Sequence, residues 1–76
     1  MSNPNKVIAE NIRVLMAIRQ IRVGELARDS GVVRNTINSL CKGDFRMIQI
    51  RTLESVAKVL DVTPAELLTK KASYRK

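Results

Sequence analysis

Gly31 separates two short amphipathic segments, and this arrangement constrains the fold more than any other feature of the chain. The first segment covers residues 23–30, and the second covers residues 33–42. The apolar residues of the second segment recur at the spacing of one buried helix face: Val33, Ile37, Leu40 and Cys41. A glycine just past a helix end permits the left-handed backbone that turns a chain sharply. The pattern therefore predicts two helices joined by a tight turn, with Gly43 ending the second helix in the same way.

The two predicted helices also carry the residues that a close crossing requires. Ala27 is small where the helix axes would approach, and the β-branched Ile37 would fill the space beside it. Leu26, Val32 and Leu40 would complete the shared core. Such a pair of helices, with a short glycine-containing turn, is a helix-turn-helix unit.

Three further helices are predicted around this unit, so the fold class is all-α with five helices. The first runs from Asn3 as its cap through Pro4 to about residue 20, the fourth covers residues 50–61, and the fifth runs from Pro64 to about Lys71. Thr63 and Glu66 form the capping-box pattern at the start of the fifth helix. The residues expected in the core are aliphatic: Ile8, Ile12, Leu15, Met16, Ile50, Leu53, Val56, Ala57, Leu60, Leu67 and Leu68. We assign residues 1–69 to one domain and residues 70–76 to a basic tail.

The charge of the chain indicates a polyanionic partner. Fourteen Lys and Arg residues oppose seven Asp and Glu residues, which gives a net charge of +7 on 76 residues. The absence of His and the single cysteine exclude a zinc site of about four Cys or His ligands, and an intrachain disulfide. No apolar run approaches the ~18–20 residues that span a bilayer. We expect a soluble, cytoplasmic, nucleoid-associated protein without cofactor, metal, membrane or small-molecule ligand.

The polar face of residues 33–42 is rich in hydrogen-bond donors and has no carboxylate. Its members are Arg34, Asn35, Asn38, Ser39 and Lys42. Arg is the commonest bidentate reader of guanine and Asn suits adenine, whereas a carboxylate would be repelled by phosphates. No paired carboxylates, glycine-rich phosphate loop or nucleophile beside a base is visible, so we do not expect an enzyme.

The ordered pattern resembles the Cro/lambda-repressor-like (XRE-type) helix-turn-helix family over residues 6–69. The matching positions are Ile12, Leu15, "ELA" at 25–27, Gly31, Val32, Thr36, Ile37, Leu40, Gly43 and "LESVAKVLDVTPAELL" at 53–68. The resemblance implies that the third helix lies in the major groove of DNA. It then implies base contacts from Arg34, Asn35, Ser39, Asn38 and Val33. It implies phosphate contacts from Arg22, Lys42, Arg46 and Arg51.

The chain departs from the family pattern at three places. Arg22 and Val23 stand where relatives usually have a Ser or Thr cap and a phosphate-binding Gln. Met16 and Cys41 replace a common Arg–Glu ion pair, so we expect these two apolar side chains to touch in the core. The loop after Gly43 is one or two residues longer than is typical.

The resemblance implies a sequence-specific, double-stranded DNA-binding transcriptional regulator, a repressor that binds a palindromic operator as a homodimer. An antitoxin-like protein-interaction module that autoregulates through the same unit is the alternative. Three surfaces remain open for the dimer: the fifth helix, the loop with Phe45, Met47 and Ile48, and the extra apolar residues of the first helix.

Overall fold

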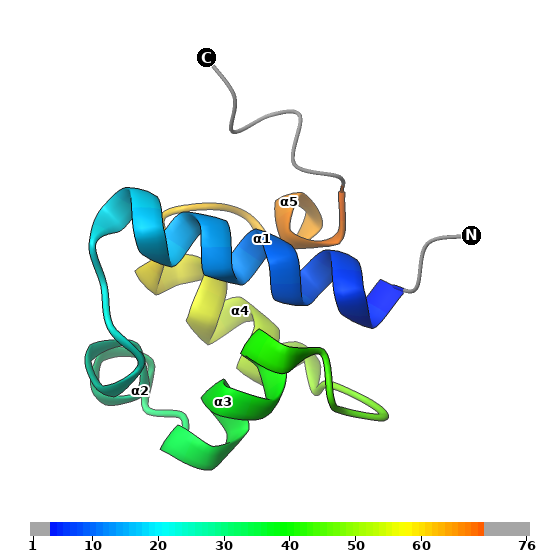
Figure 1. Ribbon diagram of the computed structural model, residues 1–76, viewed down its shortest axis with the longest axis horizontal. Coiled ribbons are helices and arrows are strands. Elements are labelled where there is room, and N and C mark those ends of the chain that lie inside the picture. Colours follow the sequence, from blue (N-terminus) through cyan, green and yellow to red (C-terminus); the bar gives the residue numbers. More distant parts are fainter. Residues whose placement is uncertain (1–3, 70–76) are drawn as a thin grey trace.

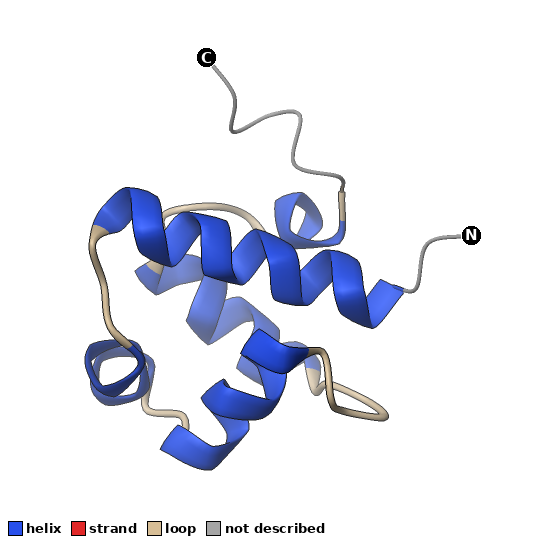
Figure 2. Ribbon diagram, viewed as in Figure 1, coloured by secondary structure: helices blue, strands red, loops and turns tan. Residues whose placement is uncertain are grey.

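The computed structural model describes residues 4–69 and confirms the all-α prediction. Figures 1 and 2 show that this part of the chain consists of helices and loops, without strands. The helices are α1 (Pro4–Arg19), α2 (Val23–Ser30), α3 (Arg34–Lys42), α4 (Ile50–Val59) and α5 (Pro64–Leu68). Helix α1 crosses the molecule, with α5 on one side of it and α2 and α3 on the other (Figure 1). This arrangement leaves one side of α3 without a neighbouring helix.

An aliphatic core joins all five helices. Its fully buried large side chains are Ile12, Leu26, Ile37, Val56, Leu60 and Leu67. Half-buried side chains from the loops pack against this core, among them Val32, Phe45 and Ile48. Each buried aliphatic side chain contributes about 1.5–3 kcal/mol to folding. The predicted apolar stripes therefore supply most of the core.

Three residues predicted to be buried are exposed instead. Val33, assigned to the buried face of residues 33–42, is 70% exposed because it is the extended cap residue before α3 and not part of the helix. Ile50 is 66% exposed because helical side chains lean toward the N-terminus, so the first residue of α4 points past the helix start. Leu68 is 56% exposed, since Leu67 already takes the core position and consecutive helical residues point about 100° apart.

The two predicted glycine turns are confirmed. Gly31 has φ 75° and Gly43 has φ 73°, both in the left-handed region. Gly43 serves a second purpose, because a Cβ at this position would lie 3.3 Å from the backbone oxygen of Asn5 and 3.4 Å from Cβ of Ala9. The missing side chain thus also lets the end of α3 approach the start of α1.

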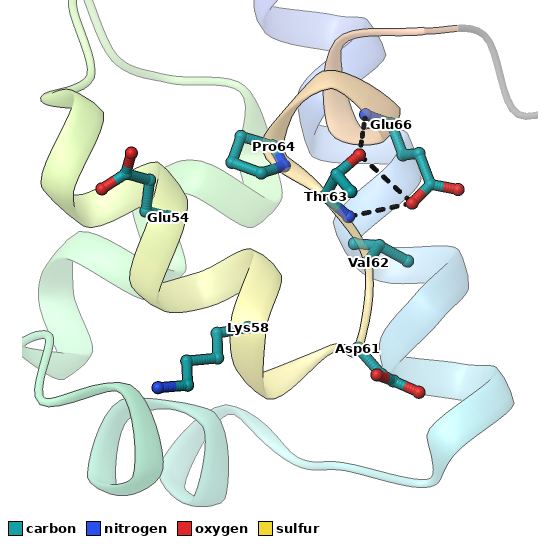
Figure 3. Close-up of a pocket in the computed structure, with 7 residues that line it drawn as sticks. All are labelled: Glu54, Lys58, Asp61, Val62, Thr63, Pro64 and Glu66. Atoms are coloured by element: carbon teal, nitrogen blue, oxygen red, sulfur yellow. Dashed lines mark hydrogen bonds between the residues drawn. The ribbon is translucent and has the colours of Figure 1, made fainter.

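The start of α5 is closed by the predicted capping box (Figure 3). The backbone N–H of Glu66 donates to Oγ1 of Thr63 at 3.2 Å, and the backbone N–H of Thr63 donates to Oε1 of Glu66 at 2.9 Å. The backbone N–H of Thr63 gains an acceptor in this way, and the N–H of Glu66 gains a second one beside the carbonyl of Thr63 at 3.0 Å.

The predicted end of the fifth helix near Lys71 is wrong, because α5 stops at Leu68 and Thr69 is extended. A buried polar residue of α1 accounts for this ending. The side-chain amide of Asn11, only 1% exposed, donates to the carbonyl of Leu67 at 2.8 Å and to that of Thr69 at 2.7 Å. These bonds satisfy the carbonyls at the helix end and hold the chain out of helical geometry. The predicted cap Asn3 and the tail 70–76 lie outside the described residues.

Candidate nucleic-acid interface

Helices α2 and α3 form the predicted helix-turn-helix. Leu26, Ile37 and Leu40 are buried between them and the rest of the core. The backbone N–H of Gly31 donates to the carbonyl of Ala27 at 3.0 Å and closes the end of α2 before the chain turns. The relative placement of the two helices is therefore fixed by core packing and by the turn.

The outward face of α3 brings most of the predicted base-contacting residues together. Ile37 and Leu40 point into the core, and successive helical residues rotate by about 100°. Asn35 and Lys42 consequently lie opposite the core, at the centre of the outward face. Asn38 flanks them and is exposed, and Val33, the residue before α3, is 70% exposed. No acidic residue belongs to α3, so this face presents donors to the solvent.

Ser39 lies at the edge of this face and is half-buried. It lines a hollow of about 410 Å³ between α3 and the loop that leads to α4, together with Asp44, Phe45 and Met47. The exposed Asp44 places a carboxylate directly after the donor-rich face. Sequence reasoning passed over this residue because it falls beyond Gly43.

Arg34 is exposed and leaves α3 on the side of α2. A Cβ on Gly24 would lie 3.3 Å from Nη2 and 3.7 Å from Cζ of Arg34. The guanidinium group therefore rests over the first turn of α2, at the border of the outward face. Sequence reasoning missed this neighbour, since Gly24 belongs to no predicted contact.

Helix α1 holds the other end of α3. The guanidinium of Arg13 donates to the carbonyl of Cys41, and the side-chain amide of Asn5 donates to the carbonyl of Phe45. Sγ of Cys41 lies 3.7 Å from Sδ of Met16, which confirms the predicted contact. Burial raises the pKa of the Cys41 thiol above its ordinary value and outweighs the opposite influence of Arg13. The thiol is therefore protonated at neutral pH and acts as an apolar packing group.

The start of α2 has half of a capping box. Arg22 is its cap residue in an extended conformation, and the backbone N–H of Arg22 donates to Oε1 of Glu25 at 3.0 Å. The reciprocal bond is impossible, because a guanidinium has no acceptor. The predicted loss of the usual cap is thus confirmed, while the contribution of Glu25 was not foreseen. The exposed guanidinium of Arg22 leaves a positive charge at this helix start.

The remaining predicted phosphate contacts flank α3. Arg46 in the loop after α3 and Arg51 in the first turn of α4 are both exposed. Figure 1 shows this loop and α2 on opposite sides of α3, so Arg22 and Arg46 belong to segments at its two flanks. Exposed cations thus lie on both sides of the donor-rich helix.

Three of the seven carboxylates gather around a hollow away from α3. A hollow of about 490 Å³ beside α4 and α5 is lined by three carboxylates, Glu54, Asp61 and Glu66, and by Lys58 (Figure 3). Helix α5 lies across α1 from α3 (Figure 1). The charge distribution therefore favours α3, and not this hollow, as the side that meets a polyanion.

Within residues 4–69, acidic, His and Cys side chains form no group of three or more that would hold a metal ion. No helix among these residues is both long enough and apolar enough to cross a bilayer.

Comparisons with known proteins agree with this geometry. Residues 11–73 match the family model of the Cro/C1-type HTH DNA-binding domain. An uncharacterized HTH-type transcriptional regulator of Bacillus subtilis (strain 168), YozG, is 33% identical over 58 residues, which cover 76% of this chain and 69% of YozG.

Two solved structures resemble the whole fold. The structure titled SinR protein/SinI protein complex has a TM-score of 0.80 at 28% identity. The match covers 91% of this chain and 67% of the chain in that structure. The structure of SinR, a master regulator for biofilm formation, in complex with DNA has a TM-score of 0.77 at 29% identity. This match covers 82% of this chain and 98% of the SinR chain in that structure. The chain therefore belongs to the Cro/C1-type (XRE-type) helix-turn-helix family and is a DNA-binding transcriptional regulator.

Proposed function

We propose that this regulator is a repressor that binds a palindromic operator as a homodimer, with α3 in the major groove. The outward face of α3 carries the proposal, because it is exposed, rich in donors and without a carboxylate. Arg34, Asn35, Asn38, Ser39 and Val33 would face base edges. Arg34 and Asn35 are the first readers, since they stand at the leading end of the helix.

Phosphate contacts would come from the exposed cations around this face: Arg22, Lys42, Arg46 and Arg51. Such contacts fix the protein on the duplex without reading its sequence. The related SinR was solved in complex with DNA, which supports duplex DNA as the partner of this chain. The net charge of +7 supports the same partner.

A homodimer follows from the small size of the reading surface. One recognition helix reads only a few base pairs, and two-fold symmetry doubles the length of sequence that is recognised. The loop after α3 is the dimer surface that we favour. Met47 in this loop is 79% exposed and Ile50 directly after it is 66% exposed. The apolar residues of the other two candidate surfaces are less exposed, at 57% for Ile18 of α1 and 56% for Leu68 of α5. A repressor would then compete with RNA polymerase for the DNA around such a site.

The proposal is tested by selecting bound duplexes from random DNA. We expect a palindrome whose half-site centres are about one helical turn, ~34 Å, apart. Affinity should fall by roughly 10³-fold or more between ~50 and ~200 mM salt if several phosphates per protomer are neutralised. The selected site, placed over a promoter, should reduce transcription when the protein is added. Footprinting that protects one unpaired half-site, or weak binding that salt leaves unchanged, would contradict the proposal.

A further inference from the structure

We infer that Gly24 is a specificity-determining position, because its missing side chain makes the space in which the guanidinium of Arg34 is held. The inference rests on the proposed base-reading role of α3. It adds a residue of α2 that itself has no side chain to offer to DNA.

The backbone does not explain why glycine occupies this position. Gly24 is the second residue of α2, and the described glycines with positive φ are Gly31 and Gly43 alone. Glycine in a helix with ordinary φ is unfavourable relative to alanine. What the absent Cβ provides at this position is therefore space, and not conformational freedom.

Arg34 occupies that space. A Cβ on Gly24 would lie 3.3 Å from Nη2, closer than an ordinary van der Waals contact, and 3.7 Å from Cζ. Apart from its two chain neighbours and the backbone of α2 itself, the same Cβ would meet no other described atom within 4 Å. A Cβ at position 24 therefore requires the guanidinium of Arg34 to shift by a few tenths of an ångström, and we expect a longer side chain to displace it further.

The position of the guanidinium matters because bidentate recognition of guanine needs the planar fork in one orientation. A surface that limits the side-chain rotamers lowers the entropy lost when the contact forms. Gly24 and the first turn of α2 form such a surface beside α3. Displacing Arg34 from it should weaken discrimination between bases more than it weakens attraction to phosphates.

The experiment compares Gly24→Ala and Gly24→Leu with the unchanged protein, each with Arg34 present and with Arg34→Ala. The measurement is the ratio of affinity for the selected site to affinity for scrambled DNA at matched salt. We expect the ratio to fall stepwise from Gly to Ala to Leu. The Leu variant should lose roughly tenfold, within the ~5- to 150-fold that a bidentate contact contributes. With Arg34→Ala, the ratio should not depend on residue 24.

Two controls separate this effect from damage to the fold. Ala and Leu favour a helix over Gly, so the melting temperature should stay the same or rise while the ratio falls. Ala65→Leu introduces the same side chain at the second residue of α5, where Ala65 is exposed, and should leave the ratio unchanged. An NMR signal of the Arg34 Nε–H group should shift in the Gly24 variants and not in Ala65→Leu.

Two results would overturn the inference. One is a ratio that residue 24 does not change, whether or not the Arg34 signal shifts. The other is an equal fall of the ratio with Arg34 present and absent. Failure of the proposed function looks different, because the unchanged protein would then show no preference for any duplex, and that result would remove both claims.

Discussion

The starts of α2 and α5 are both N-termini of short helices, but their polar groups are satisfied in different ways. At α5 the side chains of Thr63 and Glu66 each bond to the backbone of the other residue. At α2 only Glu25 makes such a bond, and the cap residue Arg22 offers a cation that cannot accept one. At the start of α5 the polar groups are paired with each other. At the start of α2 the guanidinium of Arg22 stays directed to the solvent. We call these the closed side and the outward side of the molecule.

The same division runs through α3. Its inner side packs against α1 through Cys41 and Met16, and its outer side carries Arg34 and Asn35. If the division is correct, substitutions on the closed side lower stability and leave DNA affinity unchanged. Substitutions on the outward side weaken DNA binding without lowering stability. Three substitution experiments test this, in order of decreasing expected effect.

The largest effect is expected from Cys41→Glu, on the inner side of α3. Breaking a buried ion pair costs ~3–5 kcal/mol, and we expect about 2–3 kcal/mol here because residue 41 is half-buried. Met16→Arg in the same chain should recover much of the loss by forming an ion pair with the new carboxylate. Thermal melts of both single variants and the double variant measure this. Simple additivity would show that the two positions do not interact.

Arg34→Ala and Arg46→Ala should affect different properties of DNA binding: the first should lower discrimination between sequences, and the second should lower affinity for all sequences. Arg34→Ala should cost about 1–3 kcal/mol on the selected site and relax discrimination at one base pair per half-site. Arg46→Ala should weaken binding to all sequences alike and reduce the salt slope by about one. Affinities for the selected site and for scrambled DNA, at several salt concentrations, separate the two. If Arg34→Ala lowers both affinities by the same factor, Arg34 contacts a phosphate instead of a base.

The smallest effects come from the two helix starts. Thr63→Ala should lower the free energy of unfolding by about 1 kcal/mol and leave DNA affinity unchanged. Arg22→Thr should raise the free energy of unfolding by up to about 1 kcal/mol, because Thr can cap the helix. The same substitution should weaken binding to every duplex, because a positive charge is lost. Denaturant titrations and salt-matched binding assays measure both variants. A stabilised Arg22→Thr protein with full affinity would show that the start of α2 does not contact DNA.

Local patterns predicted most of the fold. Helix periodicity, the glycines at 31 and 43, and the Thr63–Glu66 spacing each depend on a few neighbouring residues, and the structure confirms all of them. The prediction failed where tertiary packing decides. The spacing placed Ile50 and Leu68 in the core, yet both lie at helix ends where the side chain extends past its packing partners. Periodicity alone does not show where the packed part of a helix ends.

The position of Asn11 in the sequence indicates that its side chain is buried. Asn11 lies three residues after Ile8 and four before Leu15, inside the buried stripe of α1. A polar residue in such a stripe must find buried partners. No local pattern identifies them, because the carbonyls that it contacts belong to residues 67 and 69.

The site was predicted in outline and not in detail. The donor-rich face of α3 is exposed as expected, and the assignment of its residues to bases and phosphates stays a prediction. The sequence does not predict that Arg34 lies beside Gly24, because this depends on the angle at which two helices cross. The division into a domain of residues 1–69 and a basic tail also stays a prediction.

The bonds of Asn11 set an order of events during synthesis on the ribosome. Its acceptors lie 56 and 58 residues further along the chain, so they are made roughly 3 to 12 s later at ~5–20 residues per second. Until then α1 can bury its apolar stripe only with an unpaired amide, at a cost of about 1–3 kcal/mol. Residues 34–42 are made before the carbonyls that seal α1 against α5. The bond between Arg13 of α1 and the carbonyl of Cys41 in α3 can therefore form before the amide of Asn11 is paired. The packing of α1 is complete only when residues 67–69 have been made.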